Sequence, residues 1–315
     1  MKFSIAPMLD WTDKHCRYFY RLMSSEATLY TEMITTKAIL FGDKEKLLGF
    51  EDSKNKTVLQ LGGSDPKEML ECCKIASDFG YLEVNINVGC PSDRVQSGSF
   101  GATLMKTPEI VAENVAKMQQ SGLKITVKNR IGVDEMEDYS GLVNFIKIVK
   151  DAGCNDFIIH ARKAWLKGLS PKENRSVPPL NYDLVYQIKQ EFSNLNITIN
   201  GGIKTFDECQ DHLKKVDGVM LGREIYHNPY LLTSVDEIVY SQKNIPKSRV
   251  EILEQYLIYM EQQLQKDIRI RSMTRHILGL YHSQPNSKIF KRMLSGKIVE
   301  LSDIVDFIKD NKAVL

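Results

Sequence analysis

Eight short apolar or β-branched segments alternate with amphipathic segments between residues 3 and 221. This alternation predicts βα units arranged around a parallel sheet. The expected strands are 3–6, 28–31, 57–61, 82–85, 124–128, 157–160, 197–200 and 218–221. The expected helices between them include 66–79, 108–120, 141–152, 182–192 and 206–213. Several of these helices begin with Asp or Thr followed by Pro, which is a helix start signal.

The residues that follow these segments favour a closed barrel over an open, doubly wound sheet, which would also satisfy the alternation. Nearly every expected strand is followed by a polar residue or by glycine, as in Asn85-Ile-Asn87, Lys128-Asn-Arg130 and His160-Ala-Arg162. In a barrel the ends of all strands converge on one rim, where catalytic groups lie. The sequence therefore predicts an α/β fold of the (β/α)8 TIM-barrel type.

The chain has 315 residues, which leaves material beyond a barrel of about 250 residues. Strand signals stop after Tyr240, and residues 241–248 form a polar stretch that contains Pro246. Beyond it the apolar spacing is helical throughout. We expect a catalytic barrel domain over residues 1–240 and a small all-helical domain over residues 245–315.

Charge is distributed unevenly between these two parts. Residues 245–315 hold 12 Lys/Arg against 8 Asp/Glu, whereas residues 1–244 hold 30 against 32. Within residues 266–297 there are eight basic side chains and only one acidic side chain, Asp267. Such a cluster suits a phosphate backbone, although a solvated helix face is the simpler explanation. The RNA-binding interpretation predicts that Arg271, Arg275 and Arg292 contact RNA, and pairing with Asp303 or Asp306 is its alternative.

Composition excludes several other classes of protein. Hydrophobic residues make up 43% of the chain and charged residues 26%, which is sufficient for a packed core. The sequence has no apolar run near the roughly 20 residues that span a bilayer and no visible export signal. Its six cysteines include no CxxC pair, so we expect neither a disulfide framework nor a metal site. These features predict a cytoplasmic protein with reduced thiols.

One cysteine differs from the other five in its sequence context. Cys90 follows an expected strand within a loop rich in Gly and Pro, where a thiol can meet a ligand above the barrel. A cysteine without such a context is usually a small buried hydrophobic residue, and we expect this of the others. Cys90 is therefore the candidate catalytic residue.

Glycine turns after the last two expected strands predict a phosphate site. Asn200-Gly201-Gly202 follows the seventh strand and Gly222-Arg223 follows the eighth, where many barrels bind phosphate. Neither a G-x-G-x-x-G fingerprint nor a P-loop is present, which disfavours a bound dinucleotide or nucleoside triphosphate. With Gln60 and Lys128 at the rim, flavin mononucleotide (FMN) fits best. A salt bridge to Glu32 is the alternative role for Lys128.

Six strings carry a resemblance to a known family. They are APMLDWTD (6–13), LQLGG (59–63), NINVGCPSDR (85–94), IHARKAW (159–165), SPKENR (170–175) and NGGIK (200–204). Together they resemble the tRNA-dihydrouridine synthases, and within them the bacterial A branch. The resemblance extends from about residue 3 to residue 229 and continues more weakly through residues 275–280.

The resemblance implies FMN as bound cofactor, NADPH as transient reductant and tRNA as substrate, with D-loop uridines 20 and 20a as targets. It implies that Pro7, Met8, Leu9, Gln60, Lys128, His160, Asn200, Gly201, Gly202, Gly222 and Arg223 bind the flavin. It further implies that Cys90 donates a proton, that Asn87 and Arg162 lie against the target base, and that Lys172 and Arg175 contact tRNA. We also expect a monomer.

Saturation of the uracil 5,6 double bond needs a hydride at one carbon and a proton at the other. Hydride for C6 would come from the flavin after reduction by NADPH, and the thiol would protonate C5 as a general acid. A small-molecule FMN oxidoreductase of the dihydroorotate-dehydrogenase-like type is one alternative, but it leaves the basic tail unexplained. A non-catalytic RNA chaperone is another, but it leaves Cys90 and the glycine turns unexplained.

Overall fold

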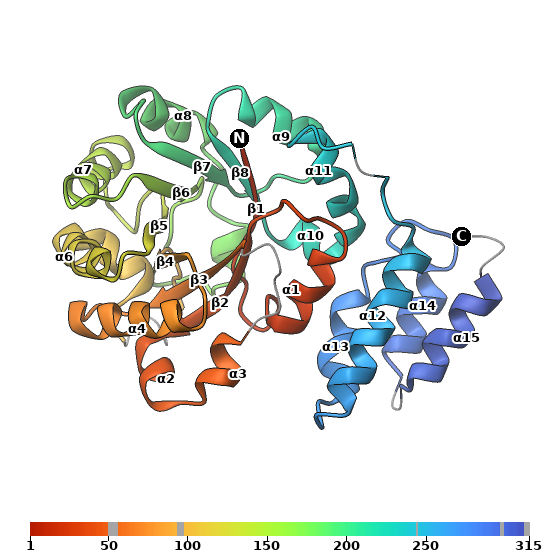
Figure 1. The fold of residues 1–315 in the computed structure, drawn as a ribbon. Coiled ribbons are helices and arrows are strands. Elements are labelled where there is room, and N and C mark those ends of the chain that lie inside the picture. Colours follow the sequence, from red (N-terminus) through yellow and green to blue (C-terminus); the bar gives the residue numbers. More distant parts are fainter. Residues whose placement is uncertain (50–55, 93–97, 244, 297–298, 312–315) are drawn as a thin grey trace.

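The computed structural model describes residues 1–49, 56–92, 98–243, 245–296 and 299–311. Its strands form one parallel sheet in the order β1-β8-β7-β6-β5-β4-β3-β2. The strands are β1 (Lys2–Ile5), β2 (Leu29–Thr35), β3 (Thr57–Gly62), β4 (Glu83–Val88), β5 (Lys124–Arg130), β6 (Asp156–His160), β7 (Asn196–Asn200) and β8 (Gly218–Leu221). A parallel bridge between Ser4 and Thr28 joins β1 to the start of β2. The sheet thus closes, and the predicted barrel is confirmed (Figure 1).

Helices surround this sheet and follow the predicted alternation (Figure 1). They are α1 (Lys14–Arg21), α2 (Thr36–Phe41), α3 (Lys44–Leu48), α4 (Pro66–Asp78), η1 (Gly101–Lys106), α6 (Pro108–Met118), η2 (Gln119–Ser121), α7 (Asp138–Asp151), η3 (Glu173–Arg175), α8 (Tyr182–Glu191), α9 (Phe206–Leu213), α10 (Arg223–His227), η4 (Pro229–Ser234) and α11 (Val235–Ile238). Local sequence fixes several starts. Asp65 accepts hydrogen bonds from the Lys67 and Glu68 amides ahead of α4, and Thr205 with Glu208 forms a capping box on α9.

Four strands, β2 to β5, continue further at their carboxyl ends than the sequence predicted, and the difference is largest in β2 and β4. β2 continues to Thr35 because it pairs with β3 as far as Gly62, with a register shift between Tyr30 and Met33. β4 continues to Val88 because it pairs with Asn129 of β5. Backbone hydrogen bonds to a neighbouring strand therefore continue these strands through polar residues that the sequence analysis placed after the strand ends. As a result, Asn87 lies within β4 itself.

The barrel interior is layered. A small apolar cluster of Ala6, Tyr30, Val58, Ile158 and Met220 packs apart from the main core between sheet and helices. Side chains two residues apart on a strand point to the same face, so the next inward layer toward the strand ends includes Gln60 and His160. The polar residues of the expected site thus stand on an apolar base, at the rim formed by the carboxyl ends of the strands. We call this rim the barrel mouth.

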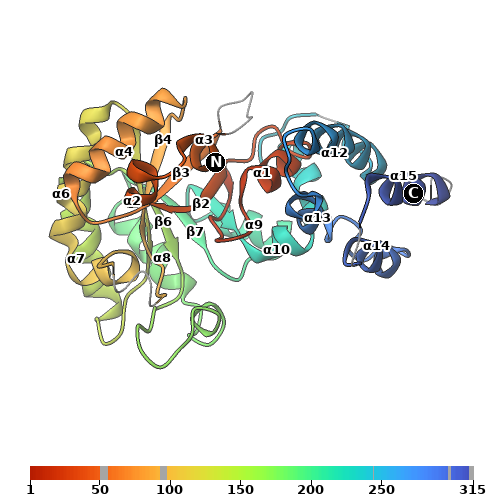
Figure 2. The ribbon, with the colours of Figure 1, turned by 90° about the horizontal axis from the view of Figure 1, so that it is seen from below.

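The rest of the described chain is helical and lies beside α1 and α10 (Figures 1 and 2). It comprises α12 (Arg249–Leu264), α13 (Ile270–Ile277), α14 (Ser287–Leu294) and α15 (Leu301–Asn311), which we call the helical tail. The Tyr18 and Tyr259 rings stack at 3.8 Å between barrel and tail. The Tyr259 hydroxyl also lies 2.7 Å from Nδ1 of His15. The predicted helical region is confirmed, while a domain boundary between residues 240 and 245 stays a prediction.

Candidate active site

The barrel mouth brings together the polar residues that the sequence analysis selected from β3, β4, β5 and β7. Nζ of Lys128 donates to Oδ1 of Asn200 over 3.2 Å, and Nδ2 of Asn200 donates to the Met220 carbonyl over 2.7 Å. Nδ2 of Asn87 donates to Oε1 of Gln60 over 2.9 Å. The partner of Lys128 is therefore Asn200 rather than Glu32. The hydrogen bond to Asn200 of β7 therefore sets the orientation of the Lys128 side chain.

Several positive charges share this mouth. Burial, with a smaller contribution from neighbouring Arg130, lowers the pKa of Lys128 to about 7. Burial also holds the pKa of His160 well below its ordinary value, with Arg130, Lys128, Arg162 and Arg223 acting in the same direction. His160 is consequently neutral at physiological pH. The hydrogen bonds that the described structure gives to Lys128, Arg130, Arg162 and Arg223 all go to neutral oxygen atoms. Such a cluster suits an anionic ligand.

The Cys90 loop is fixed by a side chain of its own strand. Oδ1 of Asn87 accepts hydrogen bonds from the Gly89 amide over 3.1 Å and from the Cys90 amide over 3.0 Å. Sγ of Cys90 lies 3.5 Å from Oγ of Ser92. Cys90 is partly exposed, whereas the other cysteines are buried as predicted. Residues Asp93 and Arg94 of the family string lie outside the described residues.

The turn after β7 requires glycine. Gly201 and Gly202 have φ values of 117° and 75°, a region that other residues rarely adopt. A Cβ atom on Gly201 would also lie 2.6 Å from Cδ2 of His160. Because the turn has no side chain at Gly201, its backbone packs directly against the His160 ring. After β8, Nη2 of Arg223 donates to the Arg175 carbonyl over 2.9 Å, which ties the end of β8 to the loop after β6.

The segment after β1 forms the apolar side of the mouth. The Met8 amide donates to Oγ1 of Thr12 over 2.9 Å, and the Asp10 amide donates to the Glu32 carboxylate. Asp10 has a φ of 63°, so this turn is sharp. Leu9, which follows Pro7 and Met8, has a side chain that is 62% exposed. An exposed leucine beside a cationic mouth suits the face of a flat ring.

The loop after β6 carries three of the expected substrate contacts. Arg162 is half-buried and donates to the Ser176 and Pro178 carbonyls, while its Nε has no hydrogen-bond partner. Lys172 and Arg175 are exposed around a 3₁₀ turn. Buried Asn174 lies between them and holds the loop, since it accepts from the Trp165 amide over 2.8 Å and donates to the Trp165 carbonyl over 2.8 Å. Sequence reasoning missed Asn174.

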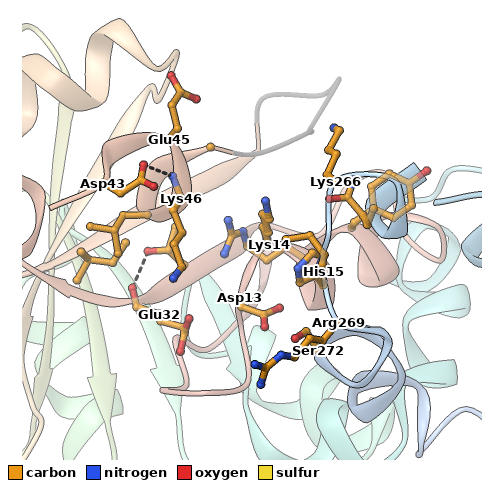
Figure 3. Close-up of a pocket in the computed structure, with 18 of the residues that line it drawn as sticks. Asp13, Lys14, His15, Glu32, Asp43, Glu45, Lys46, Lys266, Arg269 and Ser272 are labelled. Carbon is orange, nitrogen blue, oxygen red and sulfur yellow. Dashed lines mark hydrogen bonds between the residues drawn. The ribbon is translucent and has the colours of Figure 1, made fainter. Parts of the chain in front are cut away.

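A cavity of about 1080 Å³ runs between the mouth and the helical tail. Leu9 and Glu32 line its mouth side, and Figure 3 shows basic side chains from both parts of the chain around it. Lys14 and Lys46 come from the barrel, and Lys266 and Arg269 come from the tail. The sequence analysis did not select Lys14 or Lys46, because each lies on a short helix of ordinary composition.

The three arginines predicted for the tail have different surroundings. Nη2 of Arg275 lies 2.5 Å from Oδ2 of Asp13, and Nε2 of His276 lies 3.0 Å from Oδ1 of the same carboxylate. The partner of Arg275 is thus on the barrel rather than at Asp303 or Asp306. Arg271 donates to the Gly296 carbonyl, and Arg292 is exposed on α14. Lys297, the last cation of the predicted cluster, lies outside the described residues.

The described residues form a closed parallel barrel whose mouth combines cations bonded to neutral oxygens, amide side chains and a partly exposed thiol, which is typical of the enzyme sites of this fold. Comparison with known proteins identifies the family. The profile of the family described as "Dihydrouridine synthase (Dus)" matches residues 4–306. The chain belongs to this family and is a flavin-dependent oxidoreductase, as the sequence resemblance implied.

Individual relatives agree with this assignment. The chain is 52% identical over 293 residues to the tRNA-dihydrouridine(20/20a) synthase of Synechocystis sp., covering 93% of this chain and 88% of that protein. It is 53% identical over 294 residues to the enzyme of that name from Shewanella oneidensis, with coverage of 93% and 88%. Among solved structures, histamine dehydrogenase from Rhizobium sp. 4-9 matches with a TM-score of 0.56 at 12% identity, covering 75% of this chain and 45% of that one. This last likeness shows the fold alone.

Two further searches of the described residues bear on function. None of the helices in the ranges given above is both long and apolar enough to cross a membrane. The same ranges contain no group of three or more His, Cys, Asp or Glu side chains arranged to hold a metal ion.

Proposed function

We propose that this protein reduces uridines 20 and 20a in the D-loop of tRNA to 5,6-dihydrouridine, with bound FMN and with NADPH as transient reductant. The observation that carries this proposal is the barrel mouth, where unpaired cations and the partly exposed Cys90 thiol share one rim. The names of relatives at about half identity give the same activity and the same two tRNA positions. We further propose that the protein acts in the cytoplasm as a monomer.

The residues of the mouth fit FMN by their chemistry. Gln60 and Lys128 would hold the polar edge of the ring, with neutral His160 beside it and Pro7, Met8 and Leu9 along its face. The amides of Gly201 and Gly202 would hold the phosphate end with Asn200, Gly222 and Arg223, since a turn without Cβ atoms lets backbone N–H groups approach an anion. When bound, reduced flavin supplies the hydride for C6 of uracil.

Cys90 completes the reaction by donating a proton to C5. The thiol would serve as a general acid, because it carries the proton that C5 requires. Asn87 and Arg162 would lie against the uracil, one on each side of the Cys90 loop. The partnerless Nε of Arg162 and its place at the rim support this role.

The remaining residues would bind tRNA. A uridine inside folded tRNA reaches a barrel mouth only if the base leaves its stack, and this needs a firm hold on the surrounding backbone. Lys172 and Arg175 at the rim would supply some of the contacts to the tRNA backbone. Further contacts would come from Arg271, Arg275 and Arg292 in the tail. Recognition of this kind depends on the shape of the RNA more than on its base sequence.

The test is whether oxidation of NADPH depends on tRNA. Purified protein should be yellow, and NADPH consumption should rise on addition of tRNA that lacks dihydrouridine. An FMN oxidoreductase of the dihydroorotate-dehydrogenase-like type remains the alternative, because the mouth alone would also suit a small anion. Turnover with dihydroorotate-like molecules and none with tRNA would favour that alternative, and colourless protein without turnover would contradict both.

A further inference from the structure

Arg130, the last residue of β5, joins three segments that are remote in sequence. Its side chain is buried, with a residue exposure of 3%. Nε donates to the Gly89 carbonyl over 3.0 Å. Nη1 donates to the Lys163 carbonyl over 3.2 Å and to the Asn174 carbonyl over 2.9 Å. One guanidinium thus connects the loop after β4 with two points of the loop after β6.

This arrangement is unusual for a buried arginine, because all three acceptors are uncharged carbonyl oxygens. Transfer of a charged group out of water is costly, and a carboxylate normally offsets that cost. Burial lowers the pKa of Arg130 to about 10, which reflects this environment. A lysine could not replace it, since only the planar guanidinium fork directs several N–H groups at fixed angles.

The bond to Gly89 acts directly on the peptide group that precedes Cys90. Arg130 holds the carbonyl oxygen of the Gly89–Cys90 peptide, and Oδ1 of Asn87 holds the amide of the same peptide over 3.0 Å. Both polar atoms of this peptide unit are therefore fixed from opposite sides. On the other side of Cys90, its carbonyl accepts from the Ala102 amide over 2.9 Å. These contacts fix the backbone of Cys90 and therefore the direction of its Cα–Cβ bond.

We propose that Arg130 is a positioning residue for Cys90: it fixes the Gly89–Cys90 peptide against the loop that carries Arg162 and Arg175. The inference rests on the proposed role of Cys90 as the acid. Arg130 acts through geometry, so its loss should impair proton transfer to uracil and leave reduction of the flavin by NADPH intact. A displacement of about 1 Å at a reacting group can reduce a rate by about 100-fold.

A double-mutant cycle on the two half-reactions tests this proposal. The variants are Arg130→Gln, Cys90→Ala and their combination, each loaded with flavin. For each we would measure the rate of flavin reduction by NADPH and the rate of reoxidation by saturating tRNA. Arg130→Gln should slow reoxidation by about 10- to 100-fold and change reduction by less than about 3-fold. In the Cys90→Ala background the same substitution should add less than about 3-fold, because the group it positions is absent.

Two further variants separate positioning from charge and from general stability. Arg130→Lys keeps the charge but not the fork, so reoxidation should stay as slow as in Arg130→Gln. If the Arg130→Gln variant loses its flavin or no longer unfolds cooperatively, Arg130→Lys takes its place in the double-mutant cycle. Arg21→Gln is the matched control, because Nη1 of Arg21 donates to the Ser24 and Ala27 carbonyls, each over 3.0 Å, at the opposite end of the barrel. Its reoxidation rate should equal that of the wild type.

The outcomes distinguish this inference from the proposed function. If Arg130→Gln slowed flavin reoxidation by the same factor with and without Cys90, the positioning role would be overturned. Reoxidation at the wild-type rate in Arg130→Lys would also overturn it. A Cys90→Ala enzyme with the wild-type reoxidation rate would instead overturn the assignment of Cys90 as acid, whatever Arg130 does.

Discussion

The cations of the barrel mouth and those of the helical tail differ in what surrounds them. At the mouth, Lys128 and Arg130 are largely enclosed, and among the described residues they donate to neutral oxygens. In the tail, Arg275 is paired with the carboxylate of Asp13, and Arg292 is exposed to water. We propose that the two regions use their positive charges differently. Lys128 at the mouth would bind a fixed anion while Arg130 fixes two loops, and the tail would present most of its charges at the surface to a larger anion.

This difference predicts separable defects. Substitutions at Cys90, Lys128 or Arg223 should alter chemistry or cofactor retention without changing how tRNA binding depends on salt. Substitutions in the tail should alter tRNA binding and its salt dependence without changing the flavin. A substitution in one region that produced the defect expected of the other region would contradict this distinction.

The largest expected effect is that of Cys90→Ala. The variant should retain flavin and be reduced by NADPH at the wild-type rate, because the thiol acts only on the uracil. Reoxidation by tRNA should fall by about 10²- to 10⁴-fold, the usual contribution of a general acid. Stopped-flow absorbance of the flavin measures both steps. Reoxidation at the wild-type rate would show that another group supplies the proton.

Next in size is the loss of flavin from Lys128→Ala or Arg223→Ala. Each removes a cation from the site of an anionic cofactor, and a hydrogen bond to a charged group contributes about 1.5–3 kcal/mol. Flavin affinity should therefore fall by about 10- to 100-fold, as measured by fluorescence titration of flavin-free protein. Lys214→Ala is the control, because this exposed lysine pairs with Asp211 at the far end of α9. Unchanged affinity in both mouth variants would refute the proposed cofactor site.

Tail substitutions should produce a smaller effect, visible mainly in salt dependence. In a variant with Arg271 and Arg292 changed to alanine, the slope of log K against log salt should decrease by up to about one unit per lost phosphate contact. Both half-reactions at saturating tRNA should be unchanged. A variant with Lys74 and Lys147 changed to alanine, both exposed on the outer helices α4 and α7, is the control with matched charge loss.

Arg275→Ala sharpens this comparison within the tail. Because Arg275 pairs with Asp13, its loss should lower the free energy of unfolding, by about 0.2–1 kcal/mol for a pair this exposed. A thermal melt together with the salt slope separates this structural role from contact with tRNA. A folded Arg271/Arg292 variant with the wild-type slope would contradict RNA contact by the tail.

A separate effect concerns pH and the stability of the flavin-free protein. The pKa of Lys128 is lowered from its ordinary value to about 7 by burial, so between that value and about 10.4 the unfolded chain holds a proton that the folded chain lacks. Rising pH across this window should therefore stabilise the folded wild type. Lys128→Met should be the more stable form at pH 7, and its advantage should shrink toward pH 10. Denaturant titrations at several pH values measure this, and a constant difference would contradict the burial argument.

The sequence predicted the barrel because its strands are marked by β-branched runs and its mouth by polar strand ends. It predicted the place of Cys90 for the same reason. It did not predict Arg130 as the link between the loop after β4 and the loop after β6, because the carbonyls of Gly89, Lys163 and Asn174 carry no sequence signal. The pair between Asp13 and Arg275 was also missed, since 262 residues separate the two. Contacts to backbone and across the length of the chain arise only from the tertiary fold.

The most direct test of the account is a map of dihydrouridine in tRNA from cells that lack this gene. The account predicts that dihydrouridine disappears at positions 20 and 20a, that the wild-type gene restores it, and that a gene encoding Cys90→Ala does not. Unchanged dihydrouridine at both positions in the deletion strain, with no other enzyme of this family present, would contradict the proposed function.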